Sequence, residues 1–99
     1  MTFSLVLDIP SSVEHYKAAH AEFSKHPTDD MLLHIARPTS EGVQIIEVWT
    51  SEEACGKWME QCVGPVTAAL AAAGLTLPQV APTRFEAAGL IMPTAGIRF

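Results

Sequence analysis

The chain has 99 residues, of which 48% are hydrophobic and 17% are charged, and its net charge is −5. This length suits a single domain, residues 1–99, because separate cores need roughly 100–200 residues each. The negative charge argues against a nucleic-acid backbone or an anionic membrane as a partner. A small domain with this much apolar material gains stability by burying part of it against another copy, so we expect a homodimer.

Targeting and membrane signals are missing from the sequence. The N-terminus has no basic region, its first apolar run stops at Asp8, and no stretch approaches the ~18 apolar residues of a membrane span. We therefore expect a cytoplasmic protein. Cys55 and Cys62 lie seven apart on one predicted helix, about 10 Å along its axis, which is too far for a disulfide and typical of buried thiols in a reducing compartment.

The first two predicted elements are a strand and a helix. Residues 3–8 are rich in strand formers, which predicts a strand. Ser11 and Glu14 then have the S-x-x-E spacing of a capping box, which predicts a helix that runs to about Lys25. The residues spaced for one inward face of this helix are Val13, Tyr16, His20 and Phe23.

The clearest element is a β-hairpin. Its strands, residues 31–37 and 43–49, are joined by a turn that ends at Gly42, a residue suited to a positive φ. Both strands are apolar on both faces, which predicts a sheet covered by its own helices on one side and by another subunit on the other.

A second helix follows the hairpin. Thr50 and Glu53 form its predicted cap. Pro65 cannot continue the hydrogen-bond ladder, so we expect the helix to kink there or a new helix to begin. Gly74 is the predicted C-cap that ends the helical segment.

A last strand is expected around residues 83–87, followed by a tail, residues 93–99, that either packs on a partner or frays. The element order β-α-β-β-α-β predicts an α+β, ferredoxin-like fold, in which an antiparallel sheet carries both helices on one face. The other face stays open and apolar. Two such sheets would close face to face into a dimeric α/β barrel.

The run from Gly42 to Ala54, followed by Trp58 and Pro65, carries a family resemblance. In this order of strand, tryptophan, helix cap and aromatic residue, the chain resembles small dimeric α/β-barrel proteins of the antibiotic-biosynthesis-monooxygenase type. That superfamily includes cofactor-free oxygenases of aromatic polyketides, haem-degrading enzymes and polyketide cyclases, and fold alone does not choose among them. The resemblance implies a small hydrophobic or aromatic ligand, and we expect no cofactor.

The register of the hairpin determines the first candidate site. A four- or two-residue loop places His34 opposite Glu47, and Trp49 opposite Leu32 and diagonal to His34; a three- or five-residue loop separates His34 from Glu47. The other face of the hairpin is wholly apolar and the better candidate for packing on the helices, so the polar residues are predicted to point into the barrel. That apolar face consists of Leu33, Ile35, Ile46 and Val48.

In the functional interpretation, Glu47 orients His34 as a general base toward a bound phenol or enol. Trp49 then supplies a stacking wall for a flat ligand. The alternative is a satisfied cross-strand pair of His34 and Glu47, with Trp49 filling the end of the barrel.

Tyr16 and His20, four apart on the first helix, form a second candidate pair. The resemblance implies the acid and base roles that tyrosine and histidine have in the cyclase branch, whereas core packing with satisfied polar tips is the alternative. The predicted catalytic residues are therefore His34, Glu47, Tyr16 and His20. The predicted ligand-binding residues are Trp49, Trp58, Val6 and Leu32.

Two features missing from the sequence bear on the possible functions: asparagine, and any spacing typical of metal ligands. The sequence contains no asparagine, a residue that the haem-degrading and quinone-forming branches of the resembled superfamily use in the cavity. The mechanism of those branches therefore does not carry over through that residue, which weakens the oxygenase hypothesis, and a cofactor-free oxygenation would depend on deprotonation of the ligand by His34. No metal site is expected, because His15 and His20 point about 140° apart on a helix and no HxxxH or CxxC spacing occurs. Three hypotheses stay open: a cofactor-independent monooxygenase, a cyclase or isomerase, and a non-catalytic ligand-binding dimer.

Overall fold

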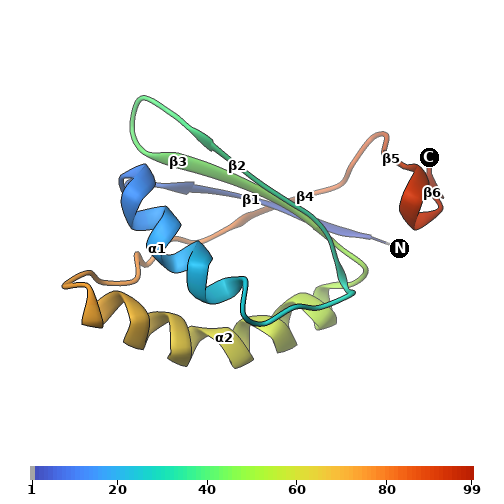
Figure 1. The fold of residues 1–99 in the computed structure, drawn as a ribbon. Helices are drawn as coiled ribbons and strands as arrows, with labels where there is room; N and C mark the ends of the chain where they lie inside the picture. Colours follow the sequence, from blue (N-terminus) through green and yellow to red (C-terminus); the bar gives the residue numbers. More distant parts are fainter. Residues whose placement is uncertain (1) are drawn as a thin grey trace.

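In the computed structural model, which describes residues 2–99, two helices cover one face of a four-stranded antiparallel sheet (Figure 1). The strands are β1 (Phe3–Ile9), β2 (Met31–Pro38), β3 (Val43–Trp49) and β4 (Thr83–Phe85), and the helices are α1 (Val13–Phe23) and α2 (Glu52–Ala72). The strand order is β2-β3-β1-β4, so each helix joins two strands that have a third between them. This arrangement confirms the predicted α+β ferredoxin-like fold.

The helix α1 starts one residue later than the sequence pattern indicates. Ser12 rather than Ser11 is the N-cap, and its hydroxyl oxygen accepts a hydrogen bond from the backbone N–H of His15 at 3.1 Å. The helix ends at Phe23, two residues before the predicted Lys25. Either serine could satisfy an N–H group of the first turn, and the spacing to Glu14 favoured Ser11, because the third residue after Ser12 is a histidine.

The helix α2 shows the same shift by one residue. Ser51 rather than Thr50 is its N-cap and accepts a hydrogen bond from the N–H of Ala54 at 3.1 Å. The hydroxyl of Thr50 instead donates to Asp30 Oδ1 at 2.9 Å. A tertiary contact therefore takes the hydroxyl that the local pattern assigns to the cap.

The helix α2 continues across Pro65 as one gently bowed element (Figure 1), so a new helix does not begin there. Cys62 and Val66, on either side of the proline, are fully buried, and this packing holds the helix together through the missing backbone hydrogen bond. Gly74 ends the helical segment as predicted, with a left-handed φ of 74°. Among the described residues no helix is long and apolar enough to span a membrane.

The hairpin has the predicted register at its centre, with His34 opposite Glu47. A bulge near the start of β2 shifts the last pairs, so Trp49 lies opposite Met31 rather than Leu32. The predicted pairing of Trp49 with Leu32 is therefore wrong, because the bulge inserts one residue that regular strand pairing does not anticipate.

Gly42 has the predicted positive φ, and close packing requires a glycine there as well. Its φ is 157°, and a Cβ atom at this position would lie 2.0 Å from the carbonyl oxygen of Ile9. The end of β1 therefore passes directly beside the hairpin turn, where only a residue without a side chain fits.

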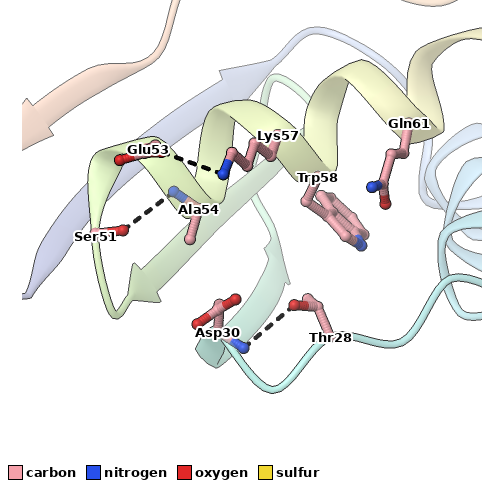
Figure 2. A pocket seen from close by; sticks show the side chains of 8 residues that line it. All are labelled: Thr28, Asp30, Ser51, Glu53, Ala54, Lys57, Trp58 and Gln61. Carbon is pink, nitrogen blue, oxygen red and sulfur yellow. Dashed lines mark hydrogen bonds and ion pairs between the residues drawn. The ribbon is translucent and has the colours of Figure 1, made fainter.

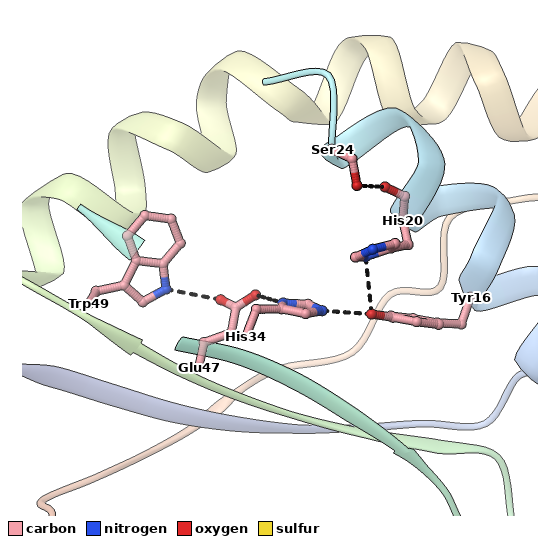
Figure 3. A network of polar contacts seen from close by, with 6 residues as sticks. All are labelled: Tyr16, His20, Ser24, His34, Glu47 and Trp49. Carbon is pink, nitrogen blue, oxygen red and sulfur yellow. Dashed lines mark hydrogen bonds and ion pairs between the residues drawn. The ribbon is translucent and has the colours of Figure 1, made fainter. Parts of the chain in front are cut away.

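The two faces of the sheet are the reverse of the prediction. His34, Glu47 and Trp49 point toward the helices (Figure 3), whereas Leu33 and Ile35 lie on the other face and are 37% and 52% exposed. The prediction assumed that the wholly apolar face would pack on the helices. The Glu47 carboxylate can be buried on the helix side instead, because each of its oxygens has a hydrogen-bond partner. Trp49, with its large apolar area, then belongs to the core.

The core lies between the sheet and α2. Its fully buried side chains include Trp49, Cys62, Val66 and Leu70. Trp58 of α2 joins the layers, since its ring stacks on Phe23 at 5.0 Å and meets Trp49 at 5.4 Å between ring centroids. Both cysteines are buried free thiols.

The chain beyond β4 forms a separate ribbon. Its strands are β5 (Ile91–Met92) and β6 (Ile97–Arg98), joined by a short 3₁₀ turn, Pro93–Ala95, and Figure 1 shows the ribbon projecting beyond the end of the sheet. β4 is two residues shorter than the predicted strand over 83–87. The tail therefore folds on itself, and its packing on a partner stays a prediction.

Candidate functional site

Five polar side chains from α1, β2 and β3 form one hydrogen-bonded chain (Figure 3). Glu47 accepts a hydrogen bond from Trp49 Nε1 at 2.9 Å, and its other oxygen lies 2.7 Å from His34 Nδ1. His34 Nε2 lies 2.7 Å from the Tyr16 hydroxyl, which lies 3.2 Å from His20 Nδ1. The two candidate pairs that the sequence indicated separately are thus one cluster.

The local geometry of each element explains this meeting. Tyr16 and His20 are one helical turn apart and share the face of α1 that covers the sheet. His34 and Glu47 are directly opposed on neighbouring strands, and Trp49 is two residues after Glu47, so all three point to the same side. The chain of polar groups forms because α1 lies over β2 and β3.

Burial affects two members of this cluster, Glu47 and Tyr16. The side chain of Glu47 is 8% exposed, and its two hydrogen-bond donors compensate the burial of an ionised carboxylate. Burial, with a smaller contribution from the charge of Glu47, raises the pKa of Tyr16 above its ordinary value of 10.0. The Tyr16 phenol is therefore protonated at neutral pH and available as a hydrogen-bond donor.

A cavity of about 350 Å³ lies between the sheet and the helices, and Tyr16, His34 and Glu47 all line it. This volume lies in the range of small-molecule sites. The remaining lining is largely apolar and comes from β1, α2 and the loop before β4. It includes Phe3, Leu5, Leu7, Trp58, Met59, Leu77 and Val80.

A second cavity of about 280 Å³ also borders His34. It shares Phe23, His34 and Trp58 with the first cavity, and it is also lined by His20 and Met31. The two cavities are therefore neighbours that have His34 and the stacked rings of Phe23 and Trp58 in common.

A third hollow, of about 370 Å³, lies at the start of α2 and is mainly polar (Figure 2). Most of its polar side chains, though not Gln61, already have a partner within the protein. Lys57 Nζ lies 3.2 Å from Glu53 Oε1, and the Ser51 hydroxyl caps the helix. This pairing leaves the hollow without a converging set of free groups, unlike the cavity at His34.

The structure divides the predicted ligand-binding residues. Trp58 lines the cavity, whereas Trp49, Val6 and Leu32 do not. Trp49 is completely buried, and its N–H holds Glu47, so it supports the carboxylate instead of forming a stacking wall. Val6 pairs with Ile46 on the open face of the sheet, and Leu32 lies at the bulge, which corrects their predicted place in the cavity.

Several lining residues carried no signal in the sequence. The loop over residues 75–82 reaches the cavity because His15 Nε2 bonds the Thr76 carbonyl oxygen at 2.8 Å. Cys55 also lines the cavity, and burial, with the charges of Glu47 and Glu52, raises the pKa of its thiol to about 11. A thiol with this pKa is not a nucleophile at neutral pH.

The described residues contain no cluster of side chains suited to binding a metal ion. Within residues 2–99 no group of three histidine, cysteine, aspartate or glutamate side chains is arranged to hold a metal ion. The acid–base side chains at the cavity are bonded to one another instead. The chemistry that the site offers directly is movement of a proton.

The fold is shared with a solved structure. The chain is similar to the crystal structure of a protein provisionally assigned as an antibiotic biosynthesis monooxygenase, from Chloroflexus aurantiacus J-10-fl, with a TM-score of 0.62 and 14% sequence identity over 93% of this chain and 98% of that one. At this identity the likeness establishes the fold. No protein-family model and no curated protein matches the sequence.

Proposed function

We propose that the protein is a cofactor-independent monooxygenase that acts on an apolar hydroxylated aromatic ligand. The observation that carries the proposal is the His34–Glu47 pair at the wall of an otherwise apolar cavity of about 350 Å³. The likeness in fold to the provisionally assigned monooxygenase supports it.

The His34–Glu47 pair supplies the base. Glu47 holds His34 through Nδ1, so Nε2 is the basic nitrogen and the carboxylate stabilises the imidazolium that forms when a proton arrives. Deprotonation converts the bound phenol into an electron-rich anion that reacts with dioxygen. The apolar lining excludes water, which strengthens the interaction of the anion with its few polar neighbours.

The overall reaction balances without a further oxidant. A hydroxyarene loses the hydrogen of its hydroxyl group and one ring hydrogen, and the ring gains one oxygen atom to become a quinone. The second atom of dioxygen leaves as water with those two hydrogens. The proton that His34 receives is returned to the departing oxygen, so the protein ends in its starting state.

A cyclase or isomerase is the second candidate. The observation that favours it is the Tyr16 hydroxyl at 2.7 Å from His34 Nε2, because a protonated phenol beside a base provides an acid and a base at one place. Such a reaction moves protons and carbon–carbon or carbon–oxygen bonds but does not consume oxygen.

Oxygen dependence separates the two candidates. We expect the purified protein, dialysed against a chelator, to convert 1-naphthol to a naphthoquinone with one dioxygen consumed for each molecule oxidised, and to be inactive under nitrogen. The measurement is oxygen uptake together with product absorbance. Turnover of cavity-sized ligands under nitrogen would instead assign the cyclase or isomerase activity, and ligand binding without turnover would indicate a non-catalytic binding protein.

We also propose that two copies associate through the open face of the sheet. Leu33 and Ile35 of β2 and Phe85 of β4 are exposed on this face at 37%, 52% and 42%. Large apolar side chains exposed on an open sheet face are typical of an interaction site. Two copies joined face to face would form the dimeric α/β barrel.

A charge placed at Ile35, the most exposed of these three side chains, tests the dimer. We expect the wild-type protein to sediment at twice the chain mass and Ile35→Lys to sediment at the chain mass, because the interface would bury an unpaired charge. The matched control is Val63→Lys, which places the same charge on an exposed position of α2 and is expected to leave the dimer intact. A wild-type monomer, or a dimeric Ile35→Lys variant, would contradict the proposal.

A further inference from the structure

The hydrogen atoms along the polar chain have one arrangement that satisfies every contact with Glu47 ionised and both histidines neutral. The Glu47 carboxylate only accepts, so Trp49 Nε1 and His34 Nδ1 both donate to it. His34 Nε2 is then an acceptor, and the Tyr16 O–H donates to it. The Tyr16 oxygen in turn accepts from His20 Nδ1.

We propose that Tyr16 is the residue that takes the ligand's proton, and that His20 is a positioning residue that keeps the Tyr16 O–H directed at His34. This inference rests on the proposed function for the identity of the ligand. It changes the role of His34, which receives the proton through Tyr16 instead of from the ligand.

The hydrogen bonds of His34 support a proton transfer that passes through Tyr16 before it reaches His34. Both ring nitrogens of His34 are already bonded, to Glu47 and to Tyr16, so a ligand has no free nitrogen to meet. The Tyr16 side chain lines the cavity, and its oxygen keeps one lone pair after it has accepted from His20. A ligand with an acidic O–H group can donate to that lone pair.

The proton step is concerted and balanced. The ligand O–H bond breaks, its proton binds the Tyr16 oxygen, and the original Tyr16 proton moves to His34 Nε2. The electron pair stays on the ligand oxygen, so the ligand becomes an anion while His34 becomes a cation beside Glu47. Tyr16 remains a neutral phenol, in agreement with the burial that opposes its ionisation.

His20 differs from the other residues of the hydrogen-bonded chain because it is exposed and lines only the second cavity. Its ring stacks on Tyr16 at 5.5 Å and lies 5.6 Å from His34 between ring centroids. Without the His20 N–H, the Tyr16 oxygen loses its second polar partner, and its O–H group is free to turn away from His34.

The groups that face Tyr16 come from three elements: His20 from α1, His34 from β2 and Glu47 from β3. Three further titratable groups line the same cavity, namely His15 from α1 and Glu52 and Cys55 from α2. Of the three groups that face Tyr16, His20 is the exposed one, so it can be removed while the His34–Glu47 pair remains intact.

A spectroscopic titration tests the arrangement without any ligand. Tyr16 is the only tyrosine of the chain, so the ultraviolet absorbance of phenolate reports its ionisation alone. We expect the pKa of Tyr16 to rise further in His20→Ala, because the phenolate loses a hydrogen-bond donor, and to fall in Glu47→Gln, because a negative charge is removed. His20→Gln, which restores an N–H donor, is expected to return the pKa toward the wild-type value.

Turnover of 1-naphthol supplies the second measurement. Tyr16→Phe is expected to lower kcat by on the order of 10²-fold or more with little change in KM, and His20→Ala to lower kcat about tenfold with partial rescue by His20→Gln. Lys17→Ala, exposed on the same helix, is the control and is expected to match the wild type in both measurements.

Two results would overturn the inference: an unchanged pKa of Tyr16 in His20→Ala, or wild-type kcat in Tyr16→Phe. Failure of the proposed function is distinguishable from both. A wild-type protein that does not oxidise 1-naphthol contradicts the monooxygenase proposal, whereas the titration still decides whether His20 directs the Tyr16 hydroxyl.

Discussion

Replacing His34 by alanine is expected to lower kcat for 1-naphthol oxidation by on the order of 10²–10⁴-fold, the contribution typical of a general base. The substitution removes the group that accepts the proton and leaves Glu47 bonded to Trp49 alone. The measurement is oxygen uptake at saturating ligand. In the proposed relay Tyr16 cannot replace the lost base, because its own proton then has no acceptor.

Arg37→Ala is the matched control for this variant. Arg37 lies on the same strand, is exposed, and bonds Gln44 at 2.8 Å on the surface. We expect its activity to equal that of the wild type. Oxygen uptake that persists unchanged in His34→Ala would place the base elsewhere and remove the central residue from the proposed site. His34→Gln, which keeps polar atoms beside Glu47, checks that a loss of activity does not come from misfolding.

Replacing Trp58 by alanine is expected to lower the free energy of unfolding by about 3–5 kcal/mol. Trp58 stacks on Phe23, meets Trp49, and donates its Nε1 hydrogen to the His26 carbonyl oxygen at 2.7 Å. The substitution therefore opens a cavity and leaves the partly buried His26 carbonyl without its partner. This loss is a large share of the roughly 5–15 kcal/mol that stabilises a typical domain.

Equilibrium unfolding in urea measures the effect at a fixed protein concentration, since association also contributes to stability. The control is Val63→Ala on the same helix, at a position that is 45% exposed, and its effect is expected to stay within about 0.5 kcal/mol. A loss below about 1 kcal/mol in Trp58→Ala would show that the packing between the two helices and the sheet does not depend on this ring.

Sequence reasoning was most successful where neighbouring residues decide the structure. Runs of strand-forming residues and turn signals predicted the strands of the hairpin, and one of its two predicted registers, that of a four- or two-residue loop, places His34 opposite Glu47 as observed. Helical spacing put Tyr16 and His20 on one face of α1. Each of these relations depends on one or two adjacent elements, whose geometry is fixed by the backbone.

The exact N-cap residue of α2, and the continuity of this helix across Pro65, could not be predicted from neighbouring residues. Thr50 and Ser51 are equivalent as local caps, and the contact of Thr50 with Asp30, twenty residues away in sequence, distinguishes them. Considered locally, Pro65 predicts a break in the helix, but the buried residues Cys62 and Val66 on either side of it keep α2 continuous. Long-range packing outweighs local preference at these positions.

The sequence by itself determined the order of the main elements and the residue types available for proton transfer, and it left two hairpin registers, one of which pairs His34 with Glu47. The tertiary structure decided which face of the sheet the helices cover, and with it where the site lies. A carboxylate such as Glu47 can lie beneath the helices only when hydrogen-bond donors compensate its burial. Those donors, Trp49 and His34, meet Glu47 only in the folded chain. The docking of α1 over β2 and β3 then joins Tyr16 and His20 to that pair, because contacts between distant segments, rather than residue spacing, bring their polar atoms within hydrogen-bond distance.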